Sequence, residues 1–547
     1  MSNEQTVDLT PDTLLTFLLN PDSYPHHPRQ VDLIQTHTAY ILRATPFVYK
    51  VKKPVNFGFL DFTTLEQRHY FCMREVELNR RLCPDLYLGV IPIGLQDGQL
   101  TFDSHTQIVE YALKMHELPN QDFLTQRLQR DAVGSTELRR IAARLQAFYQ
   151  NQAVSAATAE CGRIDQLRRI TDENFAQTRD YLGLTISPPT FAAIQHYTNY
   201  FYEQHTTLFA TRIVEGRIVD GHGDLHLEHI HLTDESICIY DCIEFNDRYR
   251  CVDVANDVAF LAMDLDYNQR SDLAREFVLL MADALNDPTL LHLMDFYKCW
   301  RAYVRGKVES LRSSEPEVPD QERQASQERA QRYFRLALQY AISGSAPTAL
   351  IIMGGVGSGK STLAAQLAAE LGWPLLASDR LRKEQAGLAV DDRSDAATRA
   401  RLYTPDAKEQ TYAALIDRAE QRAQAGESVL IDATFSRRHD RGYMCQRLAG
   451  VSMACHFIET QASAATVRQR LQAREGNDQA TSGSDARLED YAKLHESYEP
   501  PTELSPSQLI QVSTEPPLAE TVTTVLTALA TQRVLASAPC AAAQSPF

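Results

Sequence analysis

Four histidines lie close together in the stretch GHGDLHLEHIH, residues 221–231. Imidazole nitrogens bind zinc, so the stretch is a candidate metal cluster of His222, His226, His229 and His231. Neither C-x-x-C nor H-E-x-x-H accompanies these residues, and alternate strand positions such as His229 and His231 would share a face only with each other. A dedicated zinc cluster is therefore the less favoured interpretation. Hydrogen-bonded scaffolding by His222 and His226 is the favoured one.

A second stretch, GGVGSGKST at residues 354–362, fits the pattern G-x-x-x-x-G-K-[ST]. It follows an apolar strand-like run and precedes the helical TLAAQLAAEL, which is the context that this motif requires. The glycines let main-chain N–H groups surround phosphates, while Lys360 neutralises the β and γ oxygens and Ser361 holds magnesium. We therefore predict that ATP and magnesium are bound here, by Gly354, Gly355, Val356, Gly357, Ser358, Gly359, Lys360, Ser361 and Thr362.

Two aspartates end apolar runs in the same half of the chain. Asp432 closes VLID and is placed to bind the magnesium or its water, and Asp379 closes LLASD. Ligands gather at the carboxyl ends of strands in open α/β sheets, so both aspartates are expected at the phosphate site. The alternative for each is a helix N-cap, which stays open for Asp379.

The elements that must position these residues change character along the chain. Short β-type runs with one helical segment come first, long helical segments follow, and after SGSAPT apolar strands alternate with helices, which indicates a parallel sheet with crossover helices. We predict four parts: a strand-rich lobe (1–115), a helical lobe (116–345), an α/β nucleotide-binding domain (346–535) and a disordered tail (536–547).

Composition restricts the classes of function. A formal net charge of −17 argues against a general nucleic-acid or anionic-membrane binder, and no apolar stretch reaches membrane-spanning length. The first 20 residues do not read as a secretory signal, so we expect a cytoplasmic protein. Ten cysteines without a C-x-x-C pair favour reduced, mostly buried thiols.

The C-terminal part resembles small P-loop kinases of the gluconate-kinase and zeta-toxin type, through the motif above and the run SDRLRK that begins at Ser378. The resemblance implies that Asp379 accepts or orients the proton of a substrate hydroxyl and that Arg382 holds the substrate. Arg470 and Arg474, at i and i+4 of VRQRLQAREG, would be lid arginines that stabilise transition-state charge. A merely solvated basic face is the alternative for these two arginines.

The stretch HGDLHLEH, followed by a strand and Asp241, resembles the catalytic loop H-G-D-x-x-x-x-N of aminoglycoside phosphotransferases and choline kinases, a branch of the protein-kinase-like fold. The resemblance implies that Asp224 is the catalytic base and that Asp241 binds a metal ion. Lys50, or its rival Lys52, would reach the phosphates of ATP. Glu75, with Glu77 as rival, would orient that lysine, and Glu110 to Ala112 would form the adenine-binding hinge.

One position departs from the family pattern, because His229 stands where the family has a metal-binding asparagine. Magnesium prefers oxygen ligands and imidazole suits zinc or manganese, so manganese becomes an alternative cofactor for this lobe. Asp257, on the next helical segment, is expected to brace the catalytic loop.

Together these features predict an α+β, protein-kinase-like two-lobed domain followed by an α/β P-loop NTPase domain. The expected activity is ATP-dependent phosphorylation of a hydroxyl on a small molecule, such as a sugar. The alternative is a degenerate kinase-like lobe that binds a ligand without chemistry and regulates a P-loop ATPase, and His229 keeps this alternative open. Acceptor identity and oligomeric state are left open.

Overall fold

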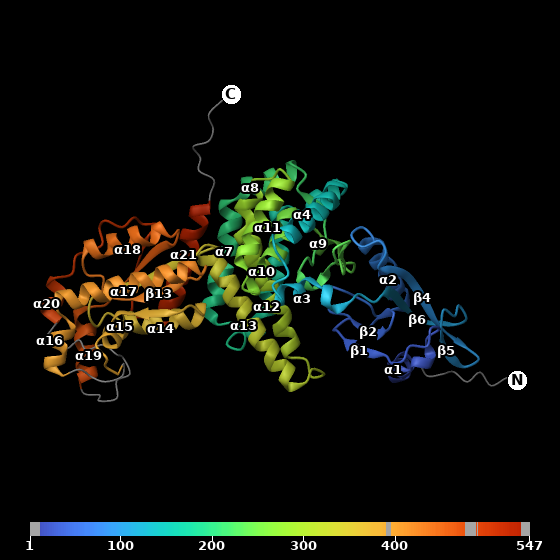
Figure 1. Cartoon of the computed structure of the whole chain (residues 1–547), viewed down its shortest axis with the longest axis horizontal. Helices are drawn as coiled ribbons and strands as arrows, with labels where there is room; N and C mark the ends of the chain where they lie inside the picture. Colours follow the sequence, from blue (N-terminus) through green and yellow to red (C-terminus); the bar gives the residue numbers. More distant parts are fainter. Residues whose placement is uncertain (1–10, 390–394, 476–487, 489–490, 538–547) are drawn as a thin grey trace, which may run out of the picture. The chain divides into compact units, whose positions relative to one another are not determined.

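A computed structural model describes residues 11–389, 395–475, 488 and 491–537 of the chain (Figure 1). Its contacts divide the chain into two compact units. The first unit comprises Met1–Leu167 and Thr207–Met294, and the second comprises Arg168–Thr206 and Asp295–Phe547. Each unit thus contains two separate segments of chain. The domain boundaries expected from the sequence stay predictions, and the expected tail lies outside the described residues from position 538 onward.

A six-stranded antiparallel sheet dominates the N-terminal part of the first unit. Its strand order is β1-β2-β3-β6-β4-β5, and helix α2 (Leu65–Asn79) packs on β6 and β4. Thr64 caps α2 by accepting from the Gln67 N–H, and the Gln67 side chain accepts from the Thr64 N–H in return, which fixes where the helix begins. The strands are β1 (Asp32–Gln35), β2 (Ala39–Ala44), β3 (Phe47–Lys52), β4 (Tyr87–Gln96), β5 (Gln99–Phe102) and β6 (Ile108–His116).

The remainder of the first unit is mostly helical, with two short β-ribbons. Helix α10 (Val254–Tyr267) is apolar around most of its circumference and is buried over most of its length, as expected for a central helix. Helices α4 (Ser135–Gln150) and α11 (Ser271–Ala284) pack against each other, and α11 packs on α10. The ribbons pair β7 (Ile218–Asp220) with β10 (Cys251–Asp253) and β8 (Ile230–Leu232) with β9 (Ile237–Ile239).

Two cysteines of the first unit form a disulfide. Cys83 follows α2 and Cys238 lies in β9, with their Cα atoms 4.7 Å apart. The expectation of reduced thiols is therefore wrong for this pair. Because 155 residues separate the two cysteines, no local sequence pattern predicts that they pair.

The second unit contains a five-stranded parallel sheet of order β12-β13-β11-β14-β15, which confirms the parallel sheet expected from the sequence. Every residue of the central strand β11 is buried, and its apolar side chains join a core with those of β13 and the surrounding helices. The strands are β11 (Thr348–Gly354), β12 (Leu375–Ala377), β13 (Val429–Asp432), β14 (Ala454–Gln461) and β15 (Leu509–Ser513).

Helices cover this sheet and extend the second unit. Helix α7 (Pro188–Gln204) packs on the C-terminal helix α21 (Leu518–Ser537) and on α13 (Asp320–Ile342). The phosphate motif leads into α14 (Lys360–Leu371), while α15 (Ser378–Gln385) follows β12 and α19 (Ala464–Glu475) follows β14. Within the described residues, no helix combines the length and apolar character needed to cross a membrane.

Candidate functional sites

The glycine-rich motif of the second unit forms the turn between β11 and α14. Gly354 and Gly359 have φ angles of 135° and 95°, which side chains disfavour. A Cβ on Gly354 would lie 2.6 Å from the main-chain oxygen of Thr460, so the loop can adopt this path only with glycine there. All residues predicted from Gly354 to Thr362 lie on this loop or on the first turn of α14. The loop and the N-terminus of α14 therefore form one turn that is shaped to surround an anion.

Lys360 lies at the start of α14 and bends back over the loop. Its Nζ donates to the main-chain oxygen of Gly355 at 2.8 Å. Ser358 donates to the same oxygen at 2.7 Å and contacts the Thr460 hydroxyl at 2.7 Å. The ammonium group is thus held inside the loop, where the phosphate oxygens of a nucleotide would be neutralised.

Asp432 is the last residue of β13, which lies beside β11 in the sheet. Burial raises the pKa of its carboxyl, while Lys360 and a hydrogen bond from Ser361 act to lower it. A carboxylate and a hydroxyl in contact are hard oxygen donors, which fit a magnesium ion. The structure therefore brings together the predicted metal ligands Ser361 and Asp432.

Asp379 is the second residue of α15, the helix that directly follows β12. Arg382 Nη1 donates to its Oδ1 at 2.7 Å, and the Tyr403 hydroxyl donates to the same atom at 3.3 Å. The N-cap position of α15 is Ala377, which has no polar side chain, so the N-cap alternative for Asp379 is wrong. The guanidinium of Arg382 also lies 4.5 Å from the centroid of the Tyr403 ring. Asp379 is therefore a partly exposed carboxylate held by two oriented donors.

Of the two predicted lid arginines, the structure describes the side chain of Arg470. Arg470 of α19 donates to Thr514 Oγ1 at 2.9 Å, to the main-chain oxygen of Thr514 at 2.7 Å and to that of Gly357 at 3.5 Å. It is therefore fixed beside the phosphate loop, which contradicts a freely solvated side chain. The side chain of Arg474 lies outside the described residues.

In the first unit, Lys50 of β3 is bound by two carboxylates. Its Nζ lies 2.8 Å from Glu75 Oε1 of α2 and 2.8 Å from Asp241 Oδ1. Burial alone would lower the pKa of Lys50, but Asp241 and Glu75 raise it well above its ordinary value. The rival carboxylate Glu77 is 68% exposed and pairs instead with Arg74. A lysine, a helix carboxylate and a strand-end carboxylate thus converge on one point.

The neighbouring lysine Lys52 occupies a more buried position. It donates to Glu75 Oε2 at 2.7 Å and pairs with Glu244, and its side chain is 2% exposed against 15% for Lys50. Lys50 is therefore the lysine that a ligand can reach. The sequence did not single out Glu244, because its partner Lys52 lies 192 positions away.

Asp257 of α10 holds the loop that carries Asp224 through two hydrogen bonds. Asp257 accepts from the His222 N–H at 2.7 Å and from the Gly223 N–H at 2.9 Å, which is the bracing arrangement expected for it. His222 Nε2 donates to the main-chain oxygen of Tyr240 at 2.9 Å, and its Nδ1 accepts from the Asp224 N–H at 3.3 Å. Burial lowers the pKa of His222 to about 3, so the ring is neutral scaffold. Asp224 itself stays partly exposed.

His229 lies between the two aspartates of this site. Its Nδ1 is 2.9 Å from the main-chain oxygen of Asp224, and its Nε2 is 3.5 Å from Asp241 Oδ2. Burial and the adjacent His226 lower the pKa of His229, which favours a neutral ring that is able to bind a metal ion. His231 bonds to the main-chain oxygen of Pro119 at 3.2 Å, outside this group.

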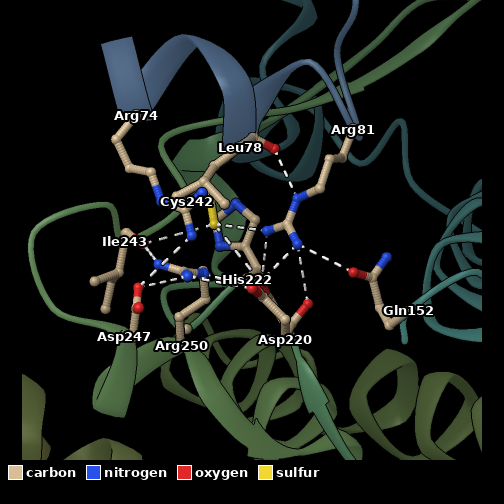
Figure 2. Close-up of polar contacts among 12 residues, drawn as sticks. Arg74, Leu78, Arg81, Gln152, Asp220, His222, Cys242, Ile243, Asp247 and Arg250 are labelled. Atoms are coloured by element: carbon tan, nitrogen blue, oxygen red, sulfur yellow. Dashed lines mark hydrogen bonds and ion pairs between the residues drawn. The ribbon is translucent and has the colours of Figure 1, made fainter. Parts of the chain in front are cut away.

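Arg81, in the segment after α2, joins that helix to the Asp224 loop (Figure 2). It donates to Asp220 Oδ1 at 2.9 Å, to the main-chain oxygen of Gly221 at 3.1 Å and to Cys242 Sγ at 3.4 Å. Asp220 in turn accepts from Arg250 Nε at 2.6 Å. Sequence reasoning missed Arg81, because no local pattern marks a contact over 139 positions.

The predicted adenine-binding residues do not lie in a linker. Glu110 and Ala112 both lie within β6, and Ala112 pairs with Val51 of β3 and Ile91 of β4. The buried carboxylate of Glu110 is bonded to Arg68 Nε at 2.9 Å. The expected hinge position is therefore wrong for both residues, because their polar groups are already used inside the sheet and its ion pair. The chain leaves the sheet only at His116.

The parallel sheet, the phosphate loop and the strand-end aspartates define the second unit as a P-loop domain of kinase-like α/β fold. Residues 350–501 match the sequence family described as an AAA domain. Over 456 residues the chain is 32% identical to uncharacterized proteins of Mycobacterium tuberculosis and Mycobacterium bovis, covering 82% of this chain and 88% of each relative. The chain belongs to the family of these mycobacterial proteins.

Solved structures similar to part of the chain include two kinases. A gluconokinase from Sinorhizobium meliloti 1021 is 24% identical, covers 34% of this chain and 92% of its own, and has a TM-score of 0.25. An APS kinase from Mycobacterium tuberculosis is 19% identical, covers 34% of this chain and 98% of its own, and has a TM-score of 0.24.

Proposed function

We propose that the chain is an ATP-dependent phosphotransferase that acts on a hydroxyl group of a small molecule, such as a sugar. One observation carries the proposal: Lys360, Asp432 and Asp379 stand at the carboxyl ends of the adjacent strands β11, β13 and β12. A phosphate cradle, a metal-binding pair and a candidate base therefore share one edge of the sheet.

Each group of this edge has a distinct role in transfer. The loop from Gly354 to Gly359 and Lys360 hold the β- and γ-phosphates, and Ser361 with Asp432 holds magnesium, which neutralises charge on the phosphates. The Asp379 carboxylate takes the proton of the acceptor hydroxyl. The acceptor oxygen then bonds to the γ-phosphorus, the bond from that phosphorus to the β,γ-bridging oxygen breaks, and ADP leaves. Arg382 orients Asp379, while Arg470 and Arg474 are proposed to stabilise charge.

The proposal extends to a second nucleotide site in the first unit. The convergence of Lys50, Glu75 and Asp241 supports it, because a lysine oriented by a helix carboxylate and a metal-binding aspartate are the parts that kinase-like phosphoryl transfer needs. Asp224 is the proposed proton acceptor. His229 with Asp241 would hold the metal ion, with manganese as an alternative to magnesium because one donor is a nitrogen.

A regulatory role for the first unit is the second candidate. The position of His229, whose ring contacts both Asp224 and Asp241, favours a regulatory role. The catalytic-loop pattern H-G-D-x-x-x-x-N has an asparagine oxygen at this position. In that case the first unit binds a nucleotide or another ligand without transferring phosphate, and the P-loop site alone is catalytic.

Full-length protein tests the proposal, because both compact units draw on two segments of chain. The wild type and an Asp379→Asn variant are given ATP labelled in its γ-phosphate and a panel of sugars and small alcohols. All proteins carry Lys50→Met, which disables the proposed site of the first unit; we expect labelled acceptor from this background, and retained nucleotide binding with strongly reduced transfer when Asp379→Asn is added. Arg380→Ala, on the same helix and 66% exposed, is the matched control. Equal transfer by Asp379→Asn and the control would reject Asp379 as the base.

A further inference from the structure

Three side chains of the Asp224 loop form a compact group of metal-binding atoms. Asp224, His226 and His229 each offer one ligand atom, and these atoms lie within 4.8 Å of one another. Asp224 Oδ2 is 3.5 Å from His226 Nε2, and the imidazole rings of His226 and His229 have centroids 3.9 Å apart. Ligands of a tetrahedral zinc ion, with bonds of about 2.0–2.2 Å, are separated by roughly 3.3–3.6 Å, and Asp224 Oδ2 and His226 Nε2 already have this separation.

Hydrogen bonding fixes the tautomer of His229. The main-chain oxygen of Asp224 only accepts, so the 2.9 Å contact requires a proton on His229 Nδ1. In a neutral ring the lone pair is then on Nε2, which faces Asp241 Oδ2 at 3.5 Å. Two acceptors that face each other are stabilised by a cation between them, so Asp241 is available as a fourth ligand.

The surroundings hold the group in place. His226 is 2% exposed, packs on the ring of Phe260 at a centroid distance of 5.5 Å, and has its Nδ1 3.9 Å from Asp264 Oδ2. Asp264 accepts a hydrogen bond from the Leu227 N–H at 3.0 Å, so the carboxylate that lies beside His226 is itself fixed by the loop. A carboxylate beside the outer nitrogen of a ligand histidine orients the ring and raises its basicity.

Neither of the other two histidines of this stretch belongs to the group. Both nitrogens of His222 are engaged, one with the Tyr240 main-chain oxygen and the other with the Asp224 N–H. His231 points to Pro119. The four-histidine cluster considered from the sequence is therefore replaced by a different set, two histidines and one aspartate.

We propose that Asp224, His226 and His229 bind a transition-metal ion of the zinc type. Two imidazoles and a carboxylate suit zinc, cobalt or nickel and do not suit magnesium. The ion would occupy the Asp224 carboxylate, so the bound ion prevents Asp224 from accepting a proton. Phosphoryl transfer by the first unit is then inhibited by zinc, and this second part rests on the proposed function.

Equilibrium dialysis of metal-stripped full-length protein against zinc chloride, without nucleotide, tests the site. We expect one tightly bound zinc in the wild type, and at least a roughly 100-fold weaker site in His226→Asn and in His229→Asn, since even neighbours of ligands change affinity by about 10–100-fold. His231→Asn, a matched histidine of the same stretch, keeps the wild-type affinity. Circular dichroism of each variant verifies its fold, and if His226→Asn fails to fold, the His229→Asn result decides.

Cobalt supplies a second readout, because bound Co²⁺ shows visible absorption whose intensity reports a four-coordinate site. Absence of tight zinc from the wild type, or equal affinity in His229→Asn and His231→Asn, would overturn the proposal. Binding is measured without phosphate transfer, so the two proposals fail separately. Zinc binding in a protein that transfers no phosphate would reject only the phosphotransferase, and transfer that is insensitive to zinc, by a protein that binds none, would reject only the metal site.

Discussion

Lys50 and Asp241, which are 191 positions apart in the sequence, are joined by an ion pair of 2.8 Å between Nζ and Oδ1. This contact links β3 to the segment that follows β9. Glu75 of α2 pairs with the same lysine. Asp241 also has a φ of 60°, an uncommon conformation that recurs at functional sites. The relationship places a cation and a candidate metal ligand together at one solvent-accessible point.

The two lysines of β3 are expected to differ in their effects. In a Lys360→Ala background, Lys50→Met should reduce transfer by the first unit about 10²–10³-fold, because a positioned charge at the phosphates is lost. Lys52→Met should instead lower the free energy of unfolding by about 3–5 kcal/mol, since it leaves the buried carboxylate of Glu244 without its partner. Labelled transfer and denaturant titration separate the two effects. Identical stability losses in both variants would contradict the assignment.

Arg81 is expected to act as a positioning residue. Arg81→Lys removes the fork that reaches both Asp220 and Gly221, so the Asp224 loop shifts relative to α2. We expect kcat of the first unit to fall about tenfold with an unchanged KM for ATP. Arg74→Lys is the control, because Arg74 pairs with the exposed Glu77 at 2.8 Å and lies 3.9 Å from the exposed Asp247. A rise in KM alone would indicate a role in binding instead.

Asp220 should make the first unit sensitive to acid. Burial acts to raise the pKa of this carboxyl, but Arg250 and Arg81 lower it below its ordinary value of 3.8. The stabilisation is therefore present above about pH 4 and is lost as the pH falls through the lower, folded-state pKa. Asp220→Asn should lower stability by roughly 1–3 kcal/mol at pH 7 and should flatten the decline below pH 4.

The pH test needs a probe of the first unit alone. Both tryptophans, Trp300 and Trp373, belong to the second unit, so tryptophan fluorescence does not report on Asp220. Hydrogen exchange in peptides that cover α2 and residues 218–253 does. An unchanged pH profile in Asp220→Asn would show that the ion pairs contribute nothing to the acid response.

His229 should set the metal preference of the first unit. In the Lys360→Ala background, His229→Asn replaces a nitrogen donor with an oxygen donor, so transfer supported by magnesium should rise relative to transfer supported by manganese. We expect the manganese-to-magnesium ratio to fall at least about tenfold. Titrating both ions at fixed ATP measures the ratio, and a constant ratio would place His229 outside the metal site.

Local patterns in the sequence predicted part of this structure well. The phosphate loop and the parallel sheet follow from a contiguous motif and from strand–helix alternation, and Asp257 braces its loop as expected. What failed depended on distant contacts. The sequence does not show that β6 lies between β3 and β4 or that Glu110 pairs with Arg68, so it wrongly predicts a hinge at Glu110. The Cys83–Cys238 disulfide and the contacts of Arg81 were invisible for the same reason.

Transfer of the γ-phosphate of ATP to a small-molecule hydroxyl, measured in full-length Lys360→Ala beside the wild type, tests the central claim most directly. The Lys360 ammonium is held inside the loop by the Gly355 oxygen, where it would neutralise the β- and γ-phosphates, so we predict a loss of about 10²–10³-fold in transfer by the second unit. The residual transfer of the first unit is removed by adding Lys50→Met. Wild-type transfer by the double variant, or no labelled acceptor from the wild type across the whole panel of hydroxyl compounds, would contradict the account.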